Sequence, residues 1–382
     1  MNFKNIIFIV GEAGTAKTTK LMSLAIDLIK TGKTLVCLAF THSAVNNMYN
    51  TFHTLNGSKP NKKLFRTIHS YFRIVPDEGI SSFNIKRKDP DYILIDEFSL
   101  IPLEIIDLIF KTCFNKLILA GDLLQLNPIS DRHGITQIEL FNNSKFLFKE
   151  TDIYSSLLVA NHLSNNVFST EQYQKCDKVL LTQNFRSENH VMKILQNVLN
   201  NQIEILHFKD QELREYVQKN NPTFIASRYE WLVLMYKEFT DSSQYDKSLN
   251  TKLGQTFYNN DKKFVLTKNV SKTIFNGDVV KIVSEGIFQH GPEQFRLEKE
   301  DDQYPILPID YISVHKSQGR GYEYVVVILD QLFEITMLYT AITRARKDVK
   351  FVLIDYDVEK FMIELKQINK AFNLLKSIIY EK

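Results

Sequence analysis

The feature that most constrains this fold is a glycine-containing turn that joins an apolar run to a helical stretch. Residues 6–10 are apolar, and the turn Gly11-Glu-Ala-Gly-Thr-Ala-Lys-Thr18 follows them directly. Residues 17–30 then repeat leucine and alanine at helical spacing, and a second apolar run spans 35–40. A strand that passes through such a turn into a helix is the setting of a phosphate-binding loop, so the chain is predicted to begin with a β-α-β element.

The turn carries the groups that phosphate binding requires. Backbone N–H groups of the turn and of the helix N-terminus would point at the β- and γ-phosphates. Lys17 would neutralise charge there, and the Thr18 hydroxyl would coordinate Mg²⁺. Ala16 stands where the usual motif has glycine, which matters if the backbone there needs a positive φ. The competing interpretation is a chance Lys-Thr pair in an ordinary turn, and the flanking elements argue against it.

Two adjacent carboxylates follow another apolar run, at residues 92–95. Asp96 and Glu97 would lie at the C-terminal end of that strand, where open α/β sheets bind ligands. Asp96 would hold Mg²⁺ through water, and Glu97 would orient and deprotonate the attacking water. Alone, a solvated acidic strand end explains the pair at least as well. The phosphate-binding turn favours the catalytic interpretation.

Composition sets limits on the class of protein. The chain has 382 residues, enough for two or three domains. Lysine and arginine exceed aspartate and glutamate by 47 − 44 = 3, so any nucleic-acid surface must be local. Three scattered cysteines suit a reducing compartment and argue against zinc. No apolar run approaches the ~18 residues that span a bilayer, so we expect a soluble, intracellular protein without a membrane partner.

Helical and strand patterns alternate along the whole chain, which predicts an α/β fold with parallel sheets. We expect two α/β lobes, one over 1–177 and one over 178–382. Two stretches differ in character and are interpreted as insertions: a basic, hairpin-like stretch at about 71–90, and a stretch of short strands at about 260–308. The apolar positions of 358–382 recur at helical spacing and predict a helix that packs on the second lobe.

Seven segments together resemble the ordered motif set of superfamily 1 helicases. They are Phe40-Thr-His-Ser-Ala44, Thr67-Ile-His-Ser70, Asp96-Glu97, Gly121-Asp-Leu-Leu-Gln-Leu-Asn-Pro128, Leu181-Thr-Gln-Asn-Phe-Arg-Ser187, Val314-His-Lys-Ser-Gln-Gly319 and Tyr339-Thr-Ala-Ile-Thr-Arg-Ala-Arg346. The resemblance spans nearly the whole chain and implies two RecA-like P-loop lobes.

Within that superfamily the chain resembles the Dda/RecD/Pif-like branch, which moves 5′→3′ along single-stranded DNA. Residues 315–318 have the branch's His-Lys-x-Gln form, 275–280 resemble the start of its small β-barrel insertion, and 71–89 stand where the branch carries a strand-separating pin. Phe83 is our candidate for the tip of that pin, where an aromatic face would stack on a base. A plain anchoring role for Phe83 explains the residue equally well. The short insertions suggest a compact viral or mobile-element member.

The resemblance assigns roles residue by residue. ATP would lie between the lobes, with Gln125 sensing the γ-phosphate, Glu323 at the ribose, and Arg186 and Arg344 reaching in from the second lobe. The implied catalytic residues are Lys17, Glu97, Gln125, Arg186 and Arg344, and the implied Mg²⁺ ligands are Thr18 and Asp96. The implied nucleotide contacts are Gly11, Gly14, Thr15, Ala16, Lys17, Thr18, Thr19, Gln318, Gly319 and Glu323. The implied nucleic-acid contacts are Thr41, His42, Thr67, His69, Phe83, His315, Lys316 and Ser317.

Three functions fit these observations. The first is a monomeric, ATP- and Mg²⁺-dependent DNA helicase that acts on single strands and duplex forks in 5′→3′ direction. The second is an RNA helicase of the kind found in viral replicases. The third is a nucleic-acid-binding protein that hydrolyses ATP weakly, which Ala16 would favour and which the presence of Lys17, Asp96, Glu97 and Arg344 argues against. For His42 and His69, a capping or buried hydrogen-bonded role is as good an interpretation as contact with a strand.

Overall fold

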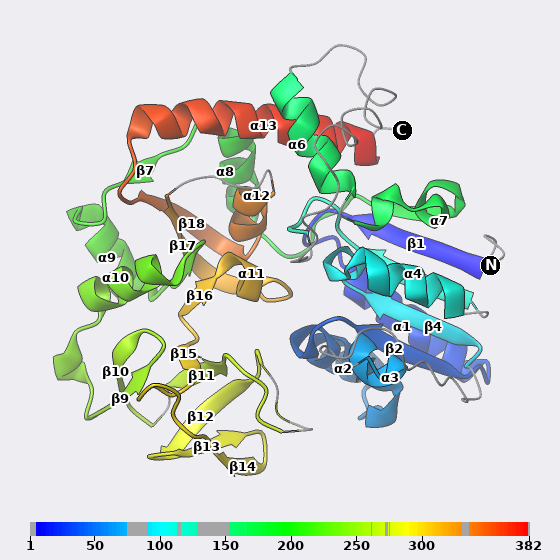
Figure 1. Ribbon diagram of the computed structural model, residues 1–382, viewed down its shortest axis with the longest axis horizontal. Coiled ribbons are helices and arrows are strands. Elements are labelled where there is room, and N and C mark those ends of the chain that lie inside the picture. The colour runs from blue at the N-terminus through cyan, green and yellow to red at the C-terminus, as the bar shows by residue number, and fades with distance from the viewer. Residues whose placement is uncertain are drawn as a thin grey trace. The chain divides into compact units, whose positions relative to one another are not determined.

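The chain forms two compact units (Figure 1). Unit 1 comprises Met1–Arg186, Phe333–Tyr339 and Glu364–Lys382, and unit 2 comprises Ser187–Leu332 and Thr340–Ile363. The computed structural model describes residues 5–74, 90–112, 116–127, 153–164, 166–260, 262–271, 274, 276–330 and 336–380.

Unit 1 is built on a parallel sheet whose described strands run in the order β3-β2-β4-β5-β1-β6. These strands are β1 (Ile6–Gly11), β2 (Leu35–Ala39), β3 (Phe65–Thr67), β4 (Tyr92–Asp96), β5 (Lys116–Gly121) and β6 (Asp177–Leu181). The helices between them are α1 (Lys17–Lys30), α2 (His42–Asn56), α3 (Ile68–Phe72), α4 (Leu103–Thr112), α6 (Ile153–Ser164) and α7 (Glu171–Lys175).

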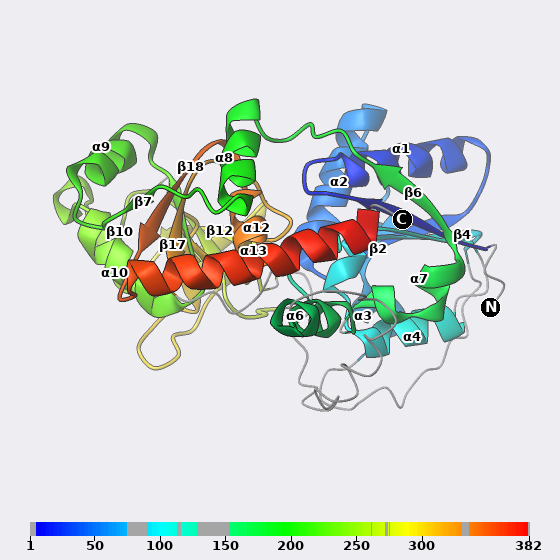
Figure 2. The ribbon, with the colours of Figure 1, turned by 90° about the horizontal axis from the view of Figure 1, so that it is seen from above.

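Both faces of this sheet are covered, which explains why its inner strands are apolar throughout rather than alternating. Along β1, Ile9 joins the core beneath α1 and α2. The side chain of Phe8 meets Phe98 and Tyr173, with ring centroids 5.6 and 4.9 Å away. Figure 2 shows α1 and α2 on one face of the sheet and α4 and α7 on the other.

Unit 2 contains a second parallel sheet, with its described strands in the order β16-β8-β17-β18-β7. These strands are β7 (Ile205–Leu206), β8 (Thr223–Ala226), β16 (Tyr311–Ser313), β17 (Tyr322–Leu329) and β18 (Ala345–Leu353). The helices are α8 (Asn189–Leu199), α9 (Gln211–Asn220), α10 (Tyr229–Phe239) and α11 (Val314–Ser317); α12 (Met337–Ile342) and α13 (Val358–Tyr380) are each divided between the two units.

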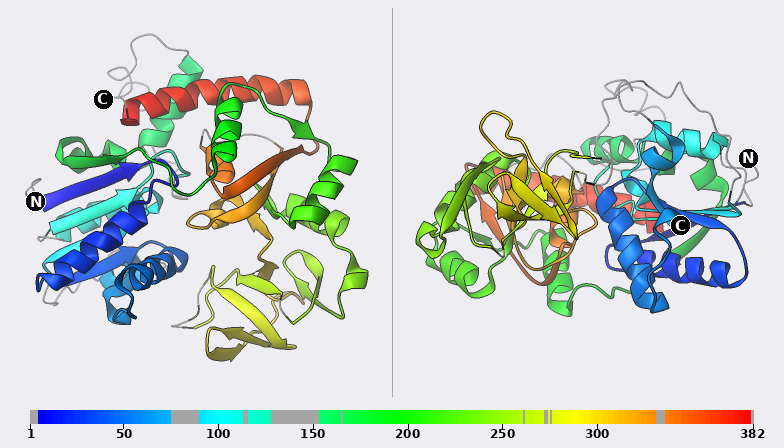
Figure 3. Two further views of the ribbon diagram at one scale, coloured as in Figure 1. Left: turned by 180° about the vertical axis from the view of Figure 1, so that it is seen from behind. Right: turned by 90° about the horizontal axis from the view of Figure 1, so that it is seen from below.

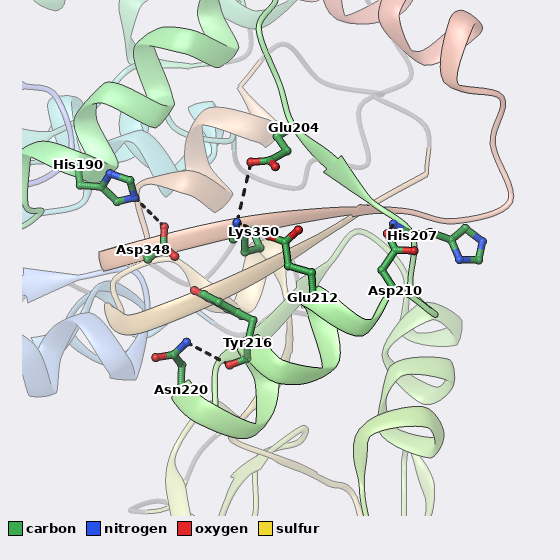
Figure 4. Close-up of polar contacts among 9 residues, drawn as sticks. All are labelled: His190, Glu204, His207, Asp210, Glu212, Tyr216, Asn220, Asp348 and Lys350. Carbon is green, nitrogen blue, oxygen red and sulfur yellow. Dashed lines mark hydrogen bonds and ion pairs between the residues drawn. The ribbon is translucent and has the colours of Figure 1, made fainter.

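Polar contacts fasten α8 and α9 to β18 (Figure 4). The ammonium of Lys350 lies 3.0 Å from a carboxylate oxygen of Glu212 and 3.9 Å from one of Glu204. His190 on α8 lies 3.1 Å from the Asp348 carboxylate. Because these groups are partly exposed, each pair contributes only about 0–1 kcal/mol, and the apolar core carries most of the stability.

A smaller antiparallel structure lies between α10 and β16 along the chain (Figure 3). Its sheet runs β14-β13-β12-β11-β15 and is preceded by the β9–β10 hairpin. The strands are β9 (Lys247–Thr251), β10 (Gly254–Tyr258), β11 (Lys263–Leu266), β12 (Val279–Ser284), β13 (Ile287–His290), β14 (Glu293–Arg296) and β15 (Ile306–Pro308). Gly277, in the turn before β12, has a φ of +92°, which glycine adopts without strain. The sheet occupies the stretch where short strands were expected.

The predicted fold class, α/β with two parallel-sheet lobes, is confirmed. The division between the lobes differs from the expected one at residue 177, because β6 pairs in parallel with β1 and belongs to the first sheet. The C-terminal helix forms, but Glu364–Lys382 packs in unit 1 instead of on the second lobe. Within the described part of the chain, no helix has the length and apolarity needed to cross a bilayer.

Candidate nucleotide and nucleic-acid sites

The phosphate-binding loop, residues 11–18, connects β1 to α1 as predicted. Gly14 has a φ of +84° and Ala16 a φ of +59°, so the backbone is left-handed at both positions. Ala16 is the N-cap residue of α1, and no side chain caps that helix end. The first N–H groups of α1 are therefore available to an anion, in a turn whose conformation alanine tolerates only with strain.

Close backbone approach explains the two glycines of the loop. A Cβ atom on Gly11 would lie 2.6 Å from both the Leu181 carbonyl oxygen and the Thr15 hydroxyl oxygen. A Cβ on Gly14 would lie 2.7 Å from the Asn184 side-chain amide. Larger residues at these positions would displace the loop.

Lys17 folds back over the loop. Its ammonium donates hydrogen bonds to the carbonyl oxygens of Gly11 and Glu12, at 2.8 and 2.7 Å. The two carbonyl oxygens, which carry only partial negative charge, therefore hold the Lys17 ammonium at the loop. Thr19, the other predicted contact in this turn of α1, is exposed.

Thr18 and Asp96 come together although they lie far apart in the sequence. The Thr18 hydroxyl donates to an Asp96 carboxylate oxygen at 2.6 Å, and the Glu97 N–H donates to the other oxygen at 3.0 Å. Burial raises the pKa of the Asp96 carboxyl, while these hydrogen bonds and the charges of Lys17 and Arg186 lower it. A hydroxyl beside a carboxylate is the oxygen donor set that Mg²⁺ prefers, so these residues fit the ion.

Glu97 adopts a left-handed backbone conformation, with φ 54°. It is the N-cap residue of the short 3₁₀ turn Phe98–Leu100 that follows β4, and its side chain forms no capping hydrogen bond. A non-glycine residue in this region is strained, and such strain is common where a side chain must be directed at a ligand.

The segment after β6 lies against the phosphate-binding loop. The Asn184 amide donates to the Ala13 carbonyl at 3.0 Å, and the Phe185 N–H donates to the Gly14 carbonyl at 2.8 Å. Arg186 follows directly and belongs to unit 1. We expected Arg186 to come from the second lobe, and this was wrong because β6 carries it to the first sheet.

Phe185 is a residue that the sequence interpretation missed. Its side chain is 65% exposed, although its backbone is bound to the loop. An exposed aromatic face beside a phosphate-binding loop is placed to stack on a base. The available signal was an aromatic residue in an otherwise polar run between a strand and a helix.

Gln125, the predicted γ-phosphate sensor, follows β5 in unit 1. Its side-chain amide donates to an Asp122 carboxylate oxygen at 3.2 Å. The residue is half-buried, and Asp122 is 2% exposed. Gln125 is thus oriented by a carboxylate that lies deeper in the protein.

Arg344 is deeply buried in unit 2, with 1% exposure. Its guanidinium donates to the Thr340 carbonyl at 3.0 Å, the Thr343 hydroxyl at 3.2 Å and the Arg320 carbonyl at 3.3 Å. These neutral acceptors fix the direction of the side chain.

The other predicted nucleotide contacts of unit 2 lie around the start of β17. Gly319 has a φ of +73°, and the Gln318 N–H donates to the His315 carbonyl at 3.3 Å. Glu323, the predicted ribose contact, accepts a hydrogen bond from Lys347 at 3.0 Å. That pair is exposed, so a ligand can displace it at low energetic cost.

Four of the predicted nucleic-acid contacts gather at one edge of the first sheet. Thr41 lies two residues after the end of β2, and Thr67 is the last residue of the neighbouring parallel strand β3, where it pairs with Ala39. Each threonine caps a helix: the Thr41 hydroxyl accepts from the Ala44 N–H at 3.1 Å, and the Thr67 hydroxyl accepts from the Ser70 N–H at 3.2 Å. Both therefore have a structural role, whether or not they also bind a strand.

The two histidines beside them lie near each other. Burial, together with the neighbouring His69, lowers the pKa of His42 to about 4, and burial also lowers the pKa of His69. The Phe40 and His69 rings are 5.1 Å apart. These residues form a largely neutral surface with aromatic faces, which suits stacking with bases more than attraction of phosphates.

The corresponding residues of unit 2 lie on α11, after β16. Burial and the Arg320 charge lower the pKa of Lys316 to about 8, and its ammonium lies 5.9 Å from the centre of the Tyr229 ring. His315 is half-buried. Ser317 is fully buried and donates to the Val314 carbonyl at 2.6 Å, so the prediction that it contacts a strand is contradicted by its inward orientation.

Phe83 and the rest of 75–89 lie outside the described residues, as does Phe275. The strand-separating insertion therefore stays a prediction. Tyr71 and Phe72, which precede it, belong to α3.

Known proteins resemble this chain in sequence. An AAA domain profile matches residues 2–131, and a UvrD-like helicase C-terminal domain profile matches 308–352. The RecBCD enzyme subunit RecD of Buchnera aphidicola subsp. Schizaphis graminum is 23% identical over 422 residues, covering 90% of this chain and 70% of that protein. The DNA replication ATP-dependent helicase/nuclease DNA2 of Saccharomyces cerevisiae is 24% identical over 230 residues, covering 52% of this chain and 14% of that protein.

Solved structures resemble the chain along nearly its whole length. The Pif1 helicase from Bacteroides, in complex with ADP-AlF3 and single-stranded DNA, has a TM-score of 0.57 and 18% identity, covering 97% of this chain and 95% of that one. The Pif1 helicase from Candida albicans has a TM-score of 0.52 and 14% identity, covering 98% and 95%. The chain therefore has the Pif1 helicase fold of two RecA-like lobes.

Proposed function

We propose that this chain, a superfamily 1 helicase of the RecD/Pif1-like branch, uses ATP to move 5′→3′ along single-stranded DNA and to separate duplexes. The observation that carries the proposal is the gathering of Lys17, Thr18 and Asp96 around an uncapped helix N-terminus, at the C-terminal ends of the inner strands β1 and β4. DNA as the substrate rests on the relatives, which include RecD and a Pif1 helicase in complex with single-stranded DNA.

ATP binding would begin in unit 1. The N–H groups of the loop would receive the β- and γ-phosphates, and Lys17 would exchange the carbonyls of Gly11 and Glu12 for phosphate oxygens. The exchange is favourable because a phosphate carries full negative charge, whereas a carbonyl is only a dipole. Phe185 would supply an apolar face on which the adenine base of ATP could stack.

Mg²⁺ would be held by Thr18 and Asp96. When bound, the ion neutralises phosphate charge and orients the terminal phosphate. The direct Thr18–Asp96 hydrogen bond would have to open to admit it. Glu97, whose backbone is left-handed, would accept a proton from the attacking water.

The two arginines would act on the charge that spreads over the transferred phosphoryl group in the transition state. Arg186 is already in unit 1, whereas Arg344 would have to exchange at least one present acceptor for a phosphate oxygen. A planar guanidinium suits this role because it forms two parallel hydrogen bonds. Gln125 would report the presence of the γ-phosphate to the rest of unit 1.

The strand would be bound by both units without reading its sequence. Unit 1 offers Thr41, His42 and His69, and unit 2 offers His315 and Lys316. Backbone contacts and stacking do not distinguish bases, so binding is expected to be sequence-independent. If the affinities of the two units for the strand alternate with the nucleotide state, each ATP turnover would move the chain one step in one direction.

The ATPase part of the proposal is tested with Lys17→Ala. We expect near-total loss of turnover stimulated by single-stranded DNA, because the charge that binds phosphate in both the ground state and the transition state disappears. Steady-state phosphate release would be measured with DNA and RNA oligomers. The matched control is Lys20→Ala, which removes an exposed lysine one turn further along α1 and should leave turnover unchanged.

Unchanged stimulated turnover in Lys17→Ala would remove the basis for any helicase function. Stimulation of the wild-type chain by RNA alone would keep the enzyme class and change the substrate.

A further inference from the structure

The carboxylate of Asp122 is a buried meeting point of unit 1. It is 2% exposed and lies directly after β5. One oxygen accepts from the Leu124 N–H at 3.0 Å and from the Tyr380 hydroxyl at 3.3 Å. The other accepts from the Gln125 amide at 3.2 Å and from the Tyr339 hydroxyl at 3.0 Å. Four donors from three segments, the turn after β5 and the helices α12 and α13, thus converge on one side chain, which we call the Asp122 hub.

Tyr339 connects this hub to the phosphate-binding loop. Its hydroxyl donates to Asp122 and also accepts the Ala13 N–H at 2.8 Å. The side chain is 3% exposed. One hydroxyl therefore joins the loop that would bind the phosphates to the carboxylate that orients Gln125, and a phenyl ring of the same size could make neither bond.

The end of α13 belongs to the same cluster. Besides the Tyr380 bond to Asp122, the ammonium of Lys376 lies 2.7 Å from a Glu12 carboxylate oxygen. The Phe372 ring packs against Tyr339, with centroids 5.2 Å apart. The last turns of the chain thus touch both the phosphate-binding loop and the hub.

Both tyrosines stay proton donors throughout the range in which ATPases are assayed. Burial, reinforced by the negative charge of Asp122, raises the pKa of Tyr339 and of Tyr380 well above the usual range. The hub is therefore a fixed arrangement of hydrogen bonds, and its direction of donation is set at neutral pH.

We infer that Tyr339 is a positioning residue for ATP hydrolysis: it fixes the phosphate-binding loop relative to Gln125, and Tyr380 on α13 completes the arrangement. This inference rests on the proposed function. Tyr339 is also the last residue of the segment that packs in unit 1, and Arg344 follows five positions later in unit 2. Tyr339 therefore holds the phosphate-binding loop and also directly precedes the segment that carries Arg344, a predicted transition-state arginine.

The test compares Tyr339→Phe with Tyr236→Phe in the full chain. Tyr236 is equally buried, and its hydroxyl also accepts a backbone N–H, that of Phe257 at 2.7 Å, but it lies in unit 2 beside the small β-structure. For Tyr339→Phe we expect kcat of DNA-stimulated ATP hydrolysis to fall about tenfold, while KM for ATP changes less than threefold. Tyr236→Phe should lower the melting temperature similarly and leave both constants unchanged.

A double-mutant cycle separates positioning from general destabilisation. Tyr380→Phe removes only the 3.3 Å bond and should lower kcat less than Tyr339→Phe. Because both hydroxyls bind the same carboxylate, the double variant should fall short of the product of the single effects. If Tyr339→Phe proves too unstable to assay, a selective loss of kcat in Tyr380→Phe carries the same inference.

The possible failures are distinguishable. A wild-type chain without nucleic-acid-stimulated turnover would overturn the proposed function and this inference with it. A wild-type chain with normal turnover, combined with tyrosine variants whose kcat and KM match those of Tyr236→Phe, would overturn the inference alone.

Discussion

At the scale of single residues, the phosphate-binding loop holds an alanine where its backbone favours glycine. The φ of 59° and ψ of 31° at Ala16 lie in the left-handed region, which costs an L-residue about 1–2 kcal/mol. The strain persists because the flanking strand and helix fix the loop. The difference from the usual motif is thus a matter of conformational energy, and Lys17 and Thr18 beside it keep their contacts.

Replacing Ala16 with glycine should stabilise the protein. Relief of the left-handed strain outweighs the greater entropy of glycine in the unfolded chain, so we expect a gain of about 0.5–1 kcal/mol in unfolding free energy. Denaturant titration of the wild type and Ala16→Gly measures it. Ala25→Gly, in the buried interior of α1, should have the opposite sign, with a loss of about 1 kcal/mol or more. A loss of similar size in both variants would contradict the account.

His162 makes stability depend on pH. It is buried on α6, and its Nε2 lies 2.8 Å from the Leu123 carbonyl oxygen, to which it must donate. Burial lowers the pKa of His162 to about 4. Since the folded pKa lies below the ordinary 6.5, its contribution is present above pH 6.5 and is lost as the pH falls towards 4.

We therefore expect unfolding free energy to decrease by about 2–3 kcal/mol between pH 7 and pH 4 through this group alone. His162→Gln should remove that part of the pH dependence, whereas His207→Gln, at an exposed position, should retain it. Denaturant titrations across this pH range provide the measurement. A His162→Gln variant with the full wild-type slope would show that another group is responsible.

At the scale of elements, the assignment of the end of the C-terminal helix α13 to unit 1 can be tested. Phe372 on α13 is 2% exposed and packs in unit 1, whereas Phe224 on β8 is equally buried and stacks on Tyr311 in unit 2 at 5.0 Å. The single tryptophan, Trp231, lies in unit 2 and donates to Asp330 at 2.8 Å. Its fluorescence therefore reports on unit 2.

Replacing either phenylalanine with alanine should lower the unfolding free energy by about 3–5 kcal/mol. The loss should fall on unit 1 for Phe372→Ala and on unit 2 for Phe224→Ala. Phe224→Ala should lower the denaturation midpoint seen by tryptophan fluorescence. Phe372→Ala should leave that midpoint nearly unchanged while lowering the first transition seen by circular dichroism. Equal shifts of the fluorescence midpoint in both variants would contradict the assignment of the helix end to unit 1.

The elements also show what the sequence could predict. The strand, turn and helix around residues 11–18 were predictable because apolar periodicity and glycine placement act locally. The place of β6 was not, because its apolar residues suit either sheet, and only its pairing with β1 decides. The Asp122 hub was hidden for a related reason: Tyr339 and Ala13 are 326 positions apart, and no local pattern records such a contact.

At the scale of the whole molecule, the sequence predicted two α/β lobes, and the fold confirms them. It also predicted a helicase of the RecD/Pif1-like branch, and the chain is similar in sequence to helicase profiles and to RecD. The separate residue roles stay predictions. The sequence could not reveal which unit holds Arg186 or the last turns of α13, because both depend on how distant segments pack. Direction of movement is a property of the complete cycle, so it needs a measurement on the intact chain.

The most direct measurement is strand separation of three DNA duplexes, carrying a 5′ tail, a 3′ tail or no tail, with wild-type chain and with Lys17→Ala. We predict ATP-dependent separation of the 5′-tailed duplex by the wild type, little separation of the other two, and none by the variant. Separation of the 3′-tailed duplex alone would contradict the direction. Separation of any duplex that is equal in wild type and Lys17→Ala would contradict the claim that ATP hydrolysis drives it.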